Sequence, residues 1–269
     1  MPELPEVETI KNELLPRVLG REITDVNLSW EGIVKQPAAG EFCSRVVGQR
    51  ITTLTRRGKY LLFHLNGGEI LVMHMKMTGS LLVNPGDGRF IRAVIDLDDG
   101  DKIYFHDPRK FGKMWLTGDE RTVAKKLGPE PLEPDFTLAV LAQCLRDRVA
   151  PVKAVILDQS VIAGIGNMYA DESLFEAKIH PLKPAGSLSG DKIERLYHAI
   201  KRVLWAAIGN KGASVRNYIR PGGEIGTAHF EFRVAHGVGK ECPFHHIPIR
   251  RITVRNRGTY YCPECQPES

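Results

Sequence analysis

The first part of the chain combines one amphipathic helical pattern with a series of short strands. Apolar residues recur at helical spacing over residues 5–19, which begin with a proline and acids and end before Gly20. From there to Thr117 the pattern becomes β-rich, and it predicts strands at residues 23–28, 50–55, 60–65, 70–75, 91–97, 102–105 and 114–116. Strands at this spacing indicate an antiparallel sandwich or barrel.

A proline-rich connector at residues 128–134 separates this region from a helical one. Beyond the connector, apolar residues at helical spacing predict helices at residues 137–148, 151–157, 167–177 and 189–208. From Phe230 strand character returns, and strands at 249–254 and 259–261 flank a predicted turn at 256–258. We therefore expect an α+β protein of three parts, residues 1–130, 131–230 and 231–269.

The charge composition of the chain is compatible with binding to a polyanion but does not establish it. The net charge of +5 and the pI of about 8.9 allow a polyanionic partner without requiring one. From Lys211 to the end, nine Lys and Arg residues stand against five Asp and Glu, so the C-terminal quarter is the more basic end. No apolar run approaches the roughly 20 residues of a spanning helix, and the N-terminus lacks the pattern of a signal peptide. We expect a cytoplasmic protein without a membrane partner.

Three of the five cysteines lie near the C-terminus in a metal-binding pattern. Cys242 and His245 form one pair with two residues between them, and Cys262 and Cys265 form another. This spacing predicts one structural zinc ion that closes a β-hairpin. His246 leaves the fourth ligand open, but His245 is favoured because it keeps the same gap in both pairs. A closed site would hold the hairpin rigid and aim Arg257 outward, although a solvated turn arginine is the plain alternative.

The N-terminus has the elements of amine catalysis. Pro2 follows Met1, and removal of that methionine would leave a secondary amine. Attack of this amine on an aldehyde-level sugar carbon would give an iminium, which is an electron sink for eliminating the neighbouring phosphates. Glu3 and Glu6 are close enough in sequence to protonate a sugar oxygen or to relay protons. Proline and acids are also ordinary at a helix start, so these residues alone leave both interpretations open.

Six segments of the chain, taken in order, carry a family resemblance: Pro2-Glu3-Leu4-Pro5-Glu6-Val7-Glu8, Arg57-Gly58-Lys59-Tyr60-Leu61, His74-Met75-Lys76-Met77-Thr78-Gly79, Asp107-Pro108-Arg109-Lys110-Phe111-Gly112, Gly164-Ile165-Gly166-Asn167-Met168-Tyr169-Ala170 and Arg257-Gly258-Thr259-Tyr260-Tyr261-Cys262. Through these segments the chain resembles, over essentially its full length, the formamidopyrimidine-DNA glycosylase family. The opening Glu3-Leu4-Pro5-Glu6 is typical of the purine-lesion form, whereas the related endonuclease VIII enzymes have Gly before the second proline.

The resemblance implies an N-terminal β-sandwich, a helix-two-turn-helix domain with a lesion-reading loop, and a C-terminal zinc-finger hairpin. It implies a monomeric enzyme that removes oxidised purines (8-oxoguanine, formamidopyrimidines) from double-stranded DNA and cleaves the strand by β,δ-elimination. Two alternatives remain: an oxidised-pyrimidine glycosylase, and a catalytically silent zinc protein that binds damaged DNA. The Leu4-Pro5 opening disfavours the first, and intact Pro2, Glu3 and Lys59 disfavour the second.

The resemblance also implies residue roles. Pro2 is the nucleophile, Glu3 the principal acid/base group and Glu6 a supporting acid. Lys59 joins this catalytic group and also contacts phosphates. The other phosphate contacts are His74, Asn167 and Arg257, a set suited to positioning the strand rather than reading its sequence. Lys153 and Glu172 match positions near the lesion pocket, with a surface ion pair as the plain alternative for each.

A base inside the duplex must be turned out before it can be cleaved from its sugar. Met77, Arg109 and Phe111 match the side chains that the family inserts into the resulting gap, although core or surface positions are the ordinary alternatives. The glycine-rich residues 220–227 match the lesion-reading loop, or are a plain linker. The sequence departs from the family at His245, where Cys is usual, at His246, where Gly is usual, and at residues 234–237, which lack the usual Tyr before Gly.

Overall fold

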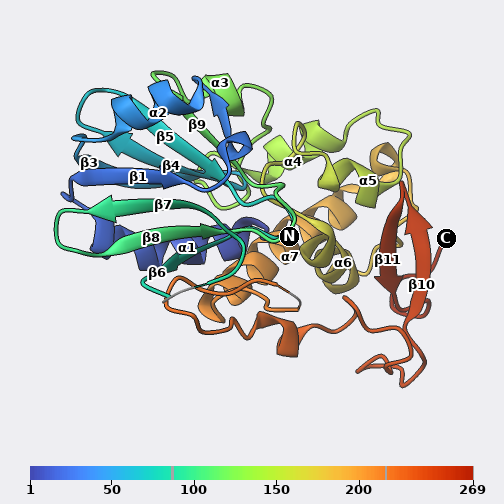
Figure 1. The fold of residues 1–269 in the computed structure, drawn as a ribbon. Coiled ribbons are helices and arrows are strands. Elements are labelled where there is room, and N and C mark those ends of the chain that lie inside the picture. The colour runs from blue at the N-terminus through green and yellow to red at the C-terminus, as the bar shows by residue number, and fades with distance from the viewer. Residues whose placement is uncertain (86–87, 216, 269) are drawn as a thin grey trace. The chain divides into compact units, whose positions relative to one another are not determined.

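The computed structural model describes residues 1–85, 88–215 and 217–268 (Figure 1). The chain divides into two compact units. Unit 1 comprises Met1–Lys125 and Ile208–His229, and unit 2 comprises Lys126–Ala207 and Phe230–Ser269. Residues 208–229 therefore pack with the N-terminal part of the chain, although they follow the helical part in sequence.

Unit 1 is a β-sandwich with a helix at its start, α1 (Leu4–Val18). One sheet has the order β1-β7-β8-β6, with β1 (Ile23–Leu28), β7 (Ile91–Leu97), β8 (Lys102–His106) and β6 (Ser80–Val83). The other has the order β2-β9-β5-β4-β3, with β2 (Val34–Gln36), β9 (Lys113–Thr117), β5 (Ile70–His74), β4 (Tyr60–Leu65) and β3 (Ile51–Arg57). Strands pair antiparallel except for β2 with β9.

The predicted strands of unit 1 are confirmed, but sequence patterning missed several short elements, among them two strands and two α-helices. These four are β2, β6, α2 (Ala39–Val46) and α3 (Arg121–Ala124). The two missed strands have three and four residues, which is too short for alternation of apolar and polar positions to stand out. Their positions in the sheets depend on pairing with β9 and β8, partners that are distant in sequence.

One apolar core fixes α1 on the sandwich. Val7, Ile10 and Leu14 are fully buried, and they belong to the same cluster as Phe63 of β4 and Phe105 of β8. Burying side chains of this size contributes about 1.5–3 kcal/mol each. The stripe of apolar residues on α1 therefore holds the helix, and with it the N-terminal residues, in a defined place on unit 1.

Unit 2 contains the predicted helices and the C-terminal hairpin. The helices are α4 (Leu138–Leu145), α5 (Val152–Leu157), α6 (Asn167–Glu176) and most of α7 (Gly190–Gly209). Short helical turns lie at Glu31–Ile33, Ala185–Ser187 and Ala228–Glu231 along the chain. Within the described residues, no helix has both the length and the apolar character needed to span a bilayer.

The hairpin turn lies earlier than its sequence predicts. Strands β10 (Arg250–Val254) and β11 (Arg257–Tyr261) pair with Val254 opposite Arg257, so the turn is the two residues Arg255 and Asn256. Both have positive φ, 43° and 61°, as a tight hairpin turn between twisted strands requires. The prediction of a turn at residues 256–258 is therefore wrong, and Arg257 is the first residue of β11.

Candidate active site and nucleic-acid interface

The N-terminal residues are held by hydrogen bonds at the start of α1. Pro2 and Glu3 are buried, and Glu3 caps the helix in a reciprocal capping box with Glu6. The fully buried Glu6 carboxylate accepts the Glu3 backbone N–H at 2.7 Å through Oε2 and the Ala213 N–H at 2.8 Å through Oε1. One carboxylate thus connects the residue after Pro2 to the segment that leads into residues 220–227.

Residues 220–227 form a loop that is attached to unit 1 at several points. The Arg220 guanidinium lies 2.6 Å from the Glu13 carboxylate of α1, and the Pro221 carbonyl accepts the Val83 N–H of β6 at 2.8 Å. Gly226 packs so tightly that a Cβ there would lie 2.2 Å from the Lys211 carbonyl oxygen. A side chain at Gly226 would therefore displace the loop, which explains the glycine.

Lys59 and His74 lie at neighbouring strand ends of unit 1, Lys59 in the β3–β4 turn and His74 at the end of β5. The His74 and Tyr60 rings pack edge to face with their centroids 4.5 Å apart. The Nδ1 atom of His74 accepts the Lys76 backbone N–H at 2.8 Å. Burial, with Lys76 and Lys59 nearby, lowers the pKa of His74 to about 3. The imidazole is therefore neutral, with its proton on Nε2 as a hydrogen-bond donor.

Met77, Arg109 and Phe111 lie on two loops of unit 1 that share one anchor. The fully buried Asp107 carboxylate accepts the Thr78 hydroxyl, the Arg109 N–H and the Gly112 N–H. Met77 and Phe111 nevertheless keep 46% and 39% of their surfaces exposed, and the Arg109 guanidinium lies 4.5 Å from the Phe111 ring centroid. Apolar side chains presented from anchored loops can enter a base stack. The anchoring by Asp107 was not anticipated from sequence.

In unit 2, Asn167 begins α6 and Arg257 is exposed at the start of β11. The Asn167 side chain donates to the Gly258 carbonyl at 3.0 Å, so the helix start contacts the residue after Arg257. Lys153 of α5 is fully buried, and its Nζ lies 2.7 Å from Asp171 Oδ1 of α6. Burial raises the pKa of the Asp171 carboxyl, and the Lys153 ammonium opposes that shift.

Glu172 binds the chain segment before the hairpin. Its carboxylate accepts the backbone N–H groups of Arg233, Val234 and Ala235 at 3.1, 2.8 and 2.7 Å. Burial raises the pKa of Glu172, while these N–H donors and the Arg233 guanidinium stabilise its charged form. The side chains of Lys153 and Glu172 thus lie inside unit 2 with protein partners, a burial that their sequence positions did not reveal.

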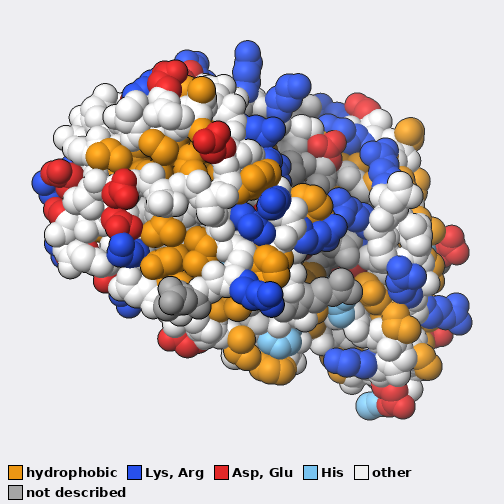
Figure 2. All heavy atoms as spheres, viewed as in Figure 1, with side chains coloured by type: hydrophobic (Ala, Val, Ile, Leu, Met, Phe, Trp, Pro, Cys, Tyr) orange, Lys and Arg blue, Asp and Glu red, His pale blue; other side chains and the backbone are white. Residues whose placement is uncertain are grey.

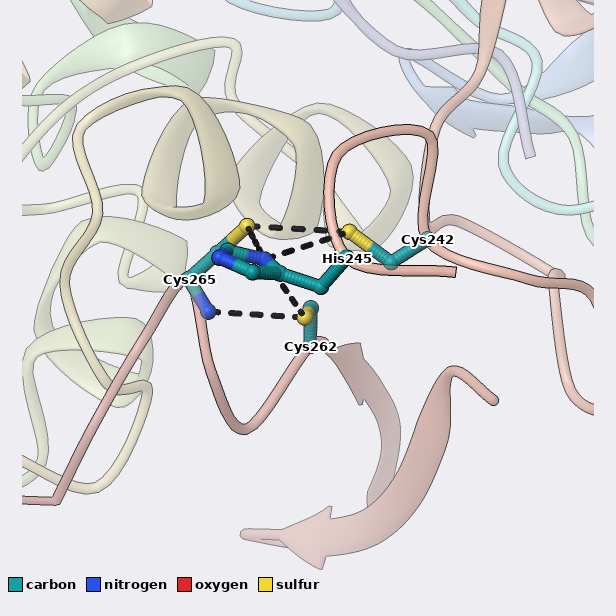
Figure 3. A group of neighbouring side chains, drawn as sticks. All are labelled: Cys242, His245, Cys262 and Cys265. Carbon is teal, nitrogen blue, oxygen red and sulfur yellow. Dashed lines mark hydrogen bonds between the residues drawn. The ribbon is translucent and has the colours of Figure 1, made fainter. Parts of the chain in front are cut away.

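Four side chains at the base of the hairpin can hold a metal ion. Figure 3 shows Cys242, His245, Cys262 and Cys265 pointing toward one another, and their ligand atoms all lie within 4.8 Å of one another. His245 Nδ1 is 3.2 Å from Cys265 Sγ and 4.0 Å from each of the other two sulfurs. His246 instead has positive φ and faces Glu241 at 3.9 Å. Three thiols and one imidazole at these separations fit a tetrahedral ion.

Figure 2 shows a number of Lys and Arg side chains at the surface on this face of the molecule. Arg109 in unit 1 and Arg257 in unit 2 are both exposed. Exposed guanidinium groups suit a polyanion because they offer several donors to phosphate oxygens.

Comparisons with known proteins agree with this geometry. Residues 1–114 match the family model of the formamidopyrimidine-DNA glycosylase N-terminal domain, and residues 127–218 match the model of its H2TH domain. The fold and these matches define the class, a DNA glycosylase. A formamidopyrimidine-DNA glycosylase of Chloroflexus aggregans is 46% identical, covering 99% of this chain and 98% of the relative. The chain belongs to the formamidopyrimidine-DNA glycosylase family.

Solved structures show the same fold. The MutM (Fpg) protein of Thermus thermophilus superposes with a TM-score of 0.91 at 38% identity, covering both chains completely. The Lactococcus lactis Fpg in complex with a DNA that contains Fapy-dG has a TM-score of 0.91 at 31% identity, covering 99% of this chain and 100% of that one. The expected β-sandwich, helical domain and C-terminal hairpin are thereby confirmed.

Proposed function

We propose that this protein excises oxidised purines, 8-oxoguanine and formamidopyrimidines, from double-stranded DNA and then cleaves the strand by β,δ-elimination. The observation that carries this proposal is the buried Pro2 at the start of α1, beside the capping box of Glu3 and Glu6. The formamidopyrimidine name of the relatives supports the purine form over the pyrimidine alternative. Borohydride trapping on duplexes with a purine or a pyrimidine lesion tests it, and we expect the adduct on the purine lesion.

The chemistry assigns separate tasks to the three N-terminal residues. Once Met1 is removed, the Pro2 nitrogen attacks the sugar carbon that bears the damaged base. The C–N bond to the base breaks, and the base leaves with the proton that the Pro2 amine loses. Glu3 supplies the proton that opens the sugar ring, which leaves a cationic iminium on Pro2. Loss of one sugar proton to a general base then expels the phosphate on the 3′ side, and loss of a second sugar proton expels the phosphate on the 5′ side. Glu6 supports these steps by holding the Glu3 backbone, because both its oxygens accept backbone N–H groups.

For DNA binding we propose that Lys59, His74, Asn167 and Arg257 contact phosphates, and that residues 220–227 read the extruded base. The four phosphate contacts carry no base-sequence information, which suits an enzyme that must act wherever a lesion occurs. The expected parts, residues 1–130, 131–230 and 231–269, keep their proposed roles in catalysis, DNA binding and metal binding, but residues 208–229 of the second part pack with unit 1. We further propose that the protein acts as a cytoplasmic monomer.

We propose that Cys242, His245, Cys262 and Cys265 bind one structural zinc ion. When bound, zinc would supply a rigid tetrahedral link between the two ends of the hairpin and no open position for substrate. The surrounding apolar cluster supports this role, because Phe175, Val234 and Ile249 pack around the three buried cysteines. Arg257 lies on the hairpin that this link would hold.

Removing the exposed side chain of Met77 or Phe111 should slow base excision without slowing strand cleavage at an abasic site. We expect Met77→Ala and Phe111→Ala to slow excision of 8-oxoguanine from duplex DNA by about tenfold or more, because only that step must meet the few-kcal/mol cost of extruding a stacked base. Cleavage at a preformed abasic site should change little. Leu19→Ala, which shortens another exposed apolar side chain of unit 1, is the matched control. Equal losses on both substrates would contradict the wedge role.

The lowered pKa of His74 predicts how stability depends on pH. Because the pKa is about 3 in the folded protein against an ordinary 6.5, the unfolded chain binds more protons between these values. Stability contributed by neutral His74 is therefore present above about pH 6.5 and is lost as the pH falls toward 3. Urea unfolding between about pH 7 and pH 5 should give a slope up to ~1.4 kcal/mol per pH unit steeper in the wild type than in His74→Asn.

The His74→Asn variant is matched because its amide oxygen can still accept the Lys76 N–H that Nδ1 accepts now. The groups that face His74, namely Lys59, Tyr60 and Lys76, stay the same in both proteins. Equal slopes in the two proteins would show that His74 takes up protons in the folded state as it does in the unfolded chain, which contradicts the lowered pKa.

A further inference from the structure

A buried ion pair in unit 2 is joined to the strand that carries Arg257. Lys153 of α5 and Asp171 of α6 are 0% and 1% exposed, with Nζ and Oδ1 2.7 Å apart. Nζ also lies 2.7 Å from the Thr259 hydroxyl and 3.2 Å from the Gly258 carbonyl, both in β11. The Lys153 ammonium is therefore bonded to α6 through one partner and to the hairpin through the other two.

The bonds continue from this pair to Arg257 itself. The Thr259 hydroxyl accepts from Lys153 and donates to the Arg257 carbonyl at 3.1 Å. Asp171 Oδ2 accepts the Tyr260 N–H at 3.2 Å, and Asn167 donates to the Gly258 carbonyl. Backbone groups of Arg257, Gly258 and Tyr260 and the side chain of Thr259 are thus all bound to side chains within this network.

Stability alone does not account for such a pair. Removing an ammonium and a carboxylate from water costs several kcal/mol per ion, and well-packed apolar residues of similar volume are often as stabilising. Directional hydrogen bonds, in contrast, fix where the bound groups lie. The network therefore fixes the position of the β11 backbone. Apolar residues could provide the same packing, but they could not supply the directional hydrogen bonds that hold these backbone groups in place.

We propose that Lys153 and Asp171 are positioning residues that act through Thr259 to fix the backbone of Arg257 for its phosphate contact, and that Lys153 does not touch DNA. The inference rests on the proposed function, which assigns that contact to Arg257. It differs from the expectation that Lys153 lies at the lesion pocket, because the Lys153 side chain is fully buried within unit 2.

A matched pair of variants at Thr259 tests the relay. Thr259→Val keeps the shape but removes the hydroxyl, whereas Thr259→Ser keeps the hydroxyl. Affinity is measured for a duplex that carries a tetrahydrofuran abasic-site analogue. We expect Thr259→Val to weaken binding about tenfold, the size of one lost hydrogen bond to a charged group, and Thr259→Ser to restore most of it. Equal affinities of the two variants would overturn the relay.

A double-mutant cycle separates an indirect from a direct role of Lys153. If Lys153 acts through Arg257, Lys153→Met should weaken binding about tenfold in the wild type and cause no further loss in Arg257→Ala. Losses that add would mean that Lys153 contacts DNA itself, which overturns the inference. Lys126→Met, which removes an exposed lysine of unit 2, is the control for loss of charge.

A second variant distinguishes positioning from stability. Lys153→Met/Asp171→Leu replaces the pair by apolar residues and should recover the thermal midpoint lost in Lys153→Met, with its metal content unchanged, but not the affinity. Recovery of both the thermal midpoint and the affinity would make the pair merely structural.

Failure of the proposed function and failure of the positioning inference give different results. If Arg257→Ala binds DNA as the wild type does, the proposed phosphate contact is wrong. If Arg257→Ala binds weakly while Thr259→Val binds as the wild type does, only the positioning inference is wrong.

Discussion

Borohydride added while the protein acts on a duplex containing 8-oxoguanine should leave a covalent protein–DNA species whose DNA-bearing peptide contains Pro2. The reason is chemical: attack by a secondary amine must pass through an iminium, and the hydride reduces that iminium to a stable amine. Pro2 is buried at the start of α1, where the apolar core and the Glu6 carboxylate hold the residues around it. Mass spectrometry of the proteolysed adduct identifies the attached residue.

Two variants give this experiment its controls. Pro2→Leu places a bulky residue after Met1, which keeps the methionine and turns the residue-2 nitrogen into an amide. We expect excision to fall by on the order of 10³-fold or more, as it does when a nucleophile is removed. Glu3→Gln should lower excision by about 10²–10⁴-fold, the usual contribution of an acid/base group, yet still trap at a preformed abasic site. An adduct at Lys59, or no adduct, would refute the assignment of Pro2.

The wild-type protein should contain one zinc ion per chain, and His245→Ala should lose it. His245 Nδ1 faces the three cysteine sulfurs, whereas His246 faces Glu241. Loss of a direct ligand should lower zinc affinity by more than the 10–100-fold that loss of an outer partner typically costs. Because the ion would close the hairpin, His245→Ala should also weaken DNA binding by misplacing Arg257. The β-sandwich has a core of its own and should stay folded.

Two substitutions make the zinc experiment decisive. His246→Ala should retain zinc, and His245→Cys should also retain it, because a fourth thiolate fits the same tetrahedral site. Metal analysis of the purified proteins and circular dichroism of the β-sandwich measure the two effects separately. Zinc retained in His245→Ala but lost in His246→Ala would show that the other histidine is the ligand, and a wild type without zinc would remove the site.

Periodicity was sufficient for the longer elements. The strands Ile23–Leu28, Tyr60–Leu65 and Ile91–Leu97 have the bounds expected from alternation and turn residues, and α1 and α7 differ from expectation by about one residue at each end. In a long element, one residue that does not fit the apolar periodicity changes the overall pattern little. The hairpin turn was predicted at the wrong residues because Gly258 was taken as a turn residue. The turn is formed by Arg255 and Asn256, which adopt the required positive φ.

The sequence by itself determined the family, the main helices and strands, and the four candidate metal ligands, since these follow from local spacing and motif order. Only the tertiary structure decided that residues 208–229 pack with the sandwich, that Glu6 binds Ala213, and that His74 stays neutral. It also decided that Lys153 is buried against Asp171 and Thr259. Burial and partner choice depend on residues far apart in the chain, and a lysine has the same appearance in sequence whether its ammonium meets water, phosphate or a buried carboxylate.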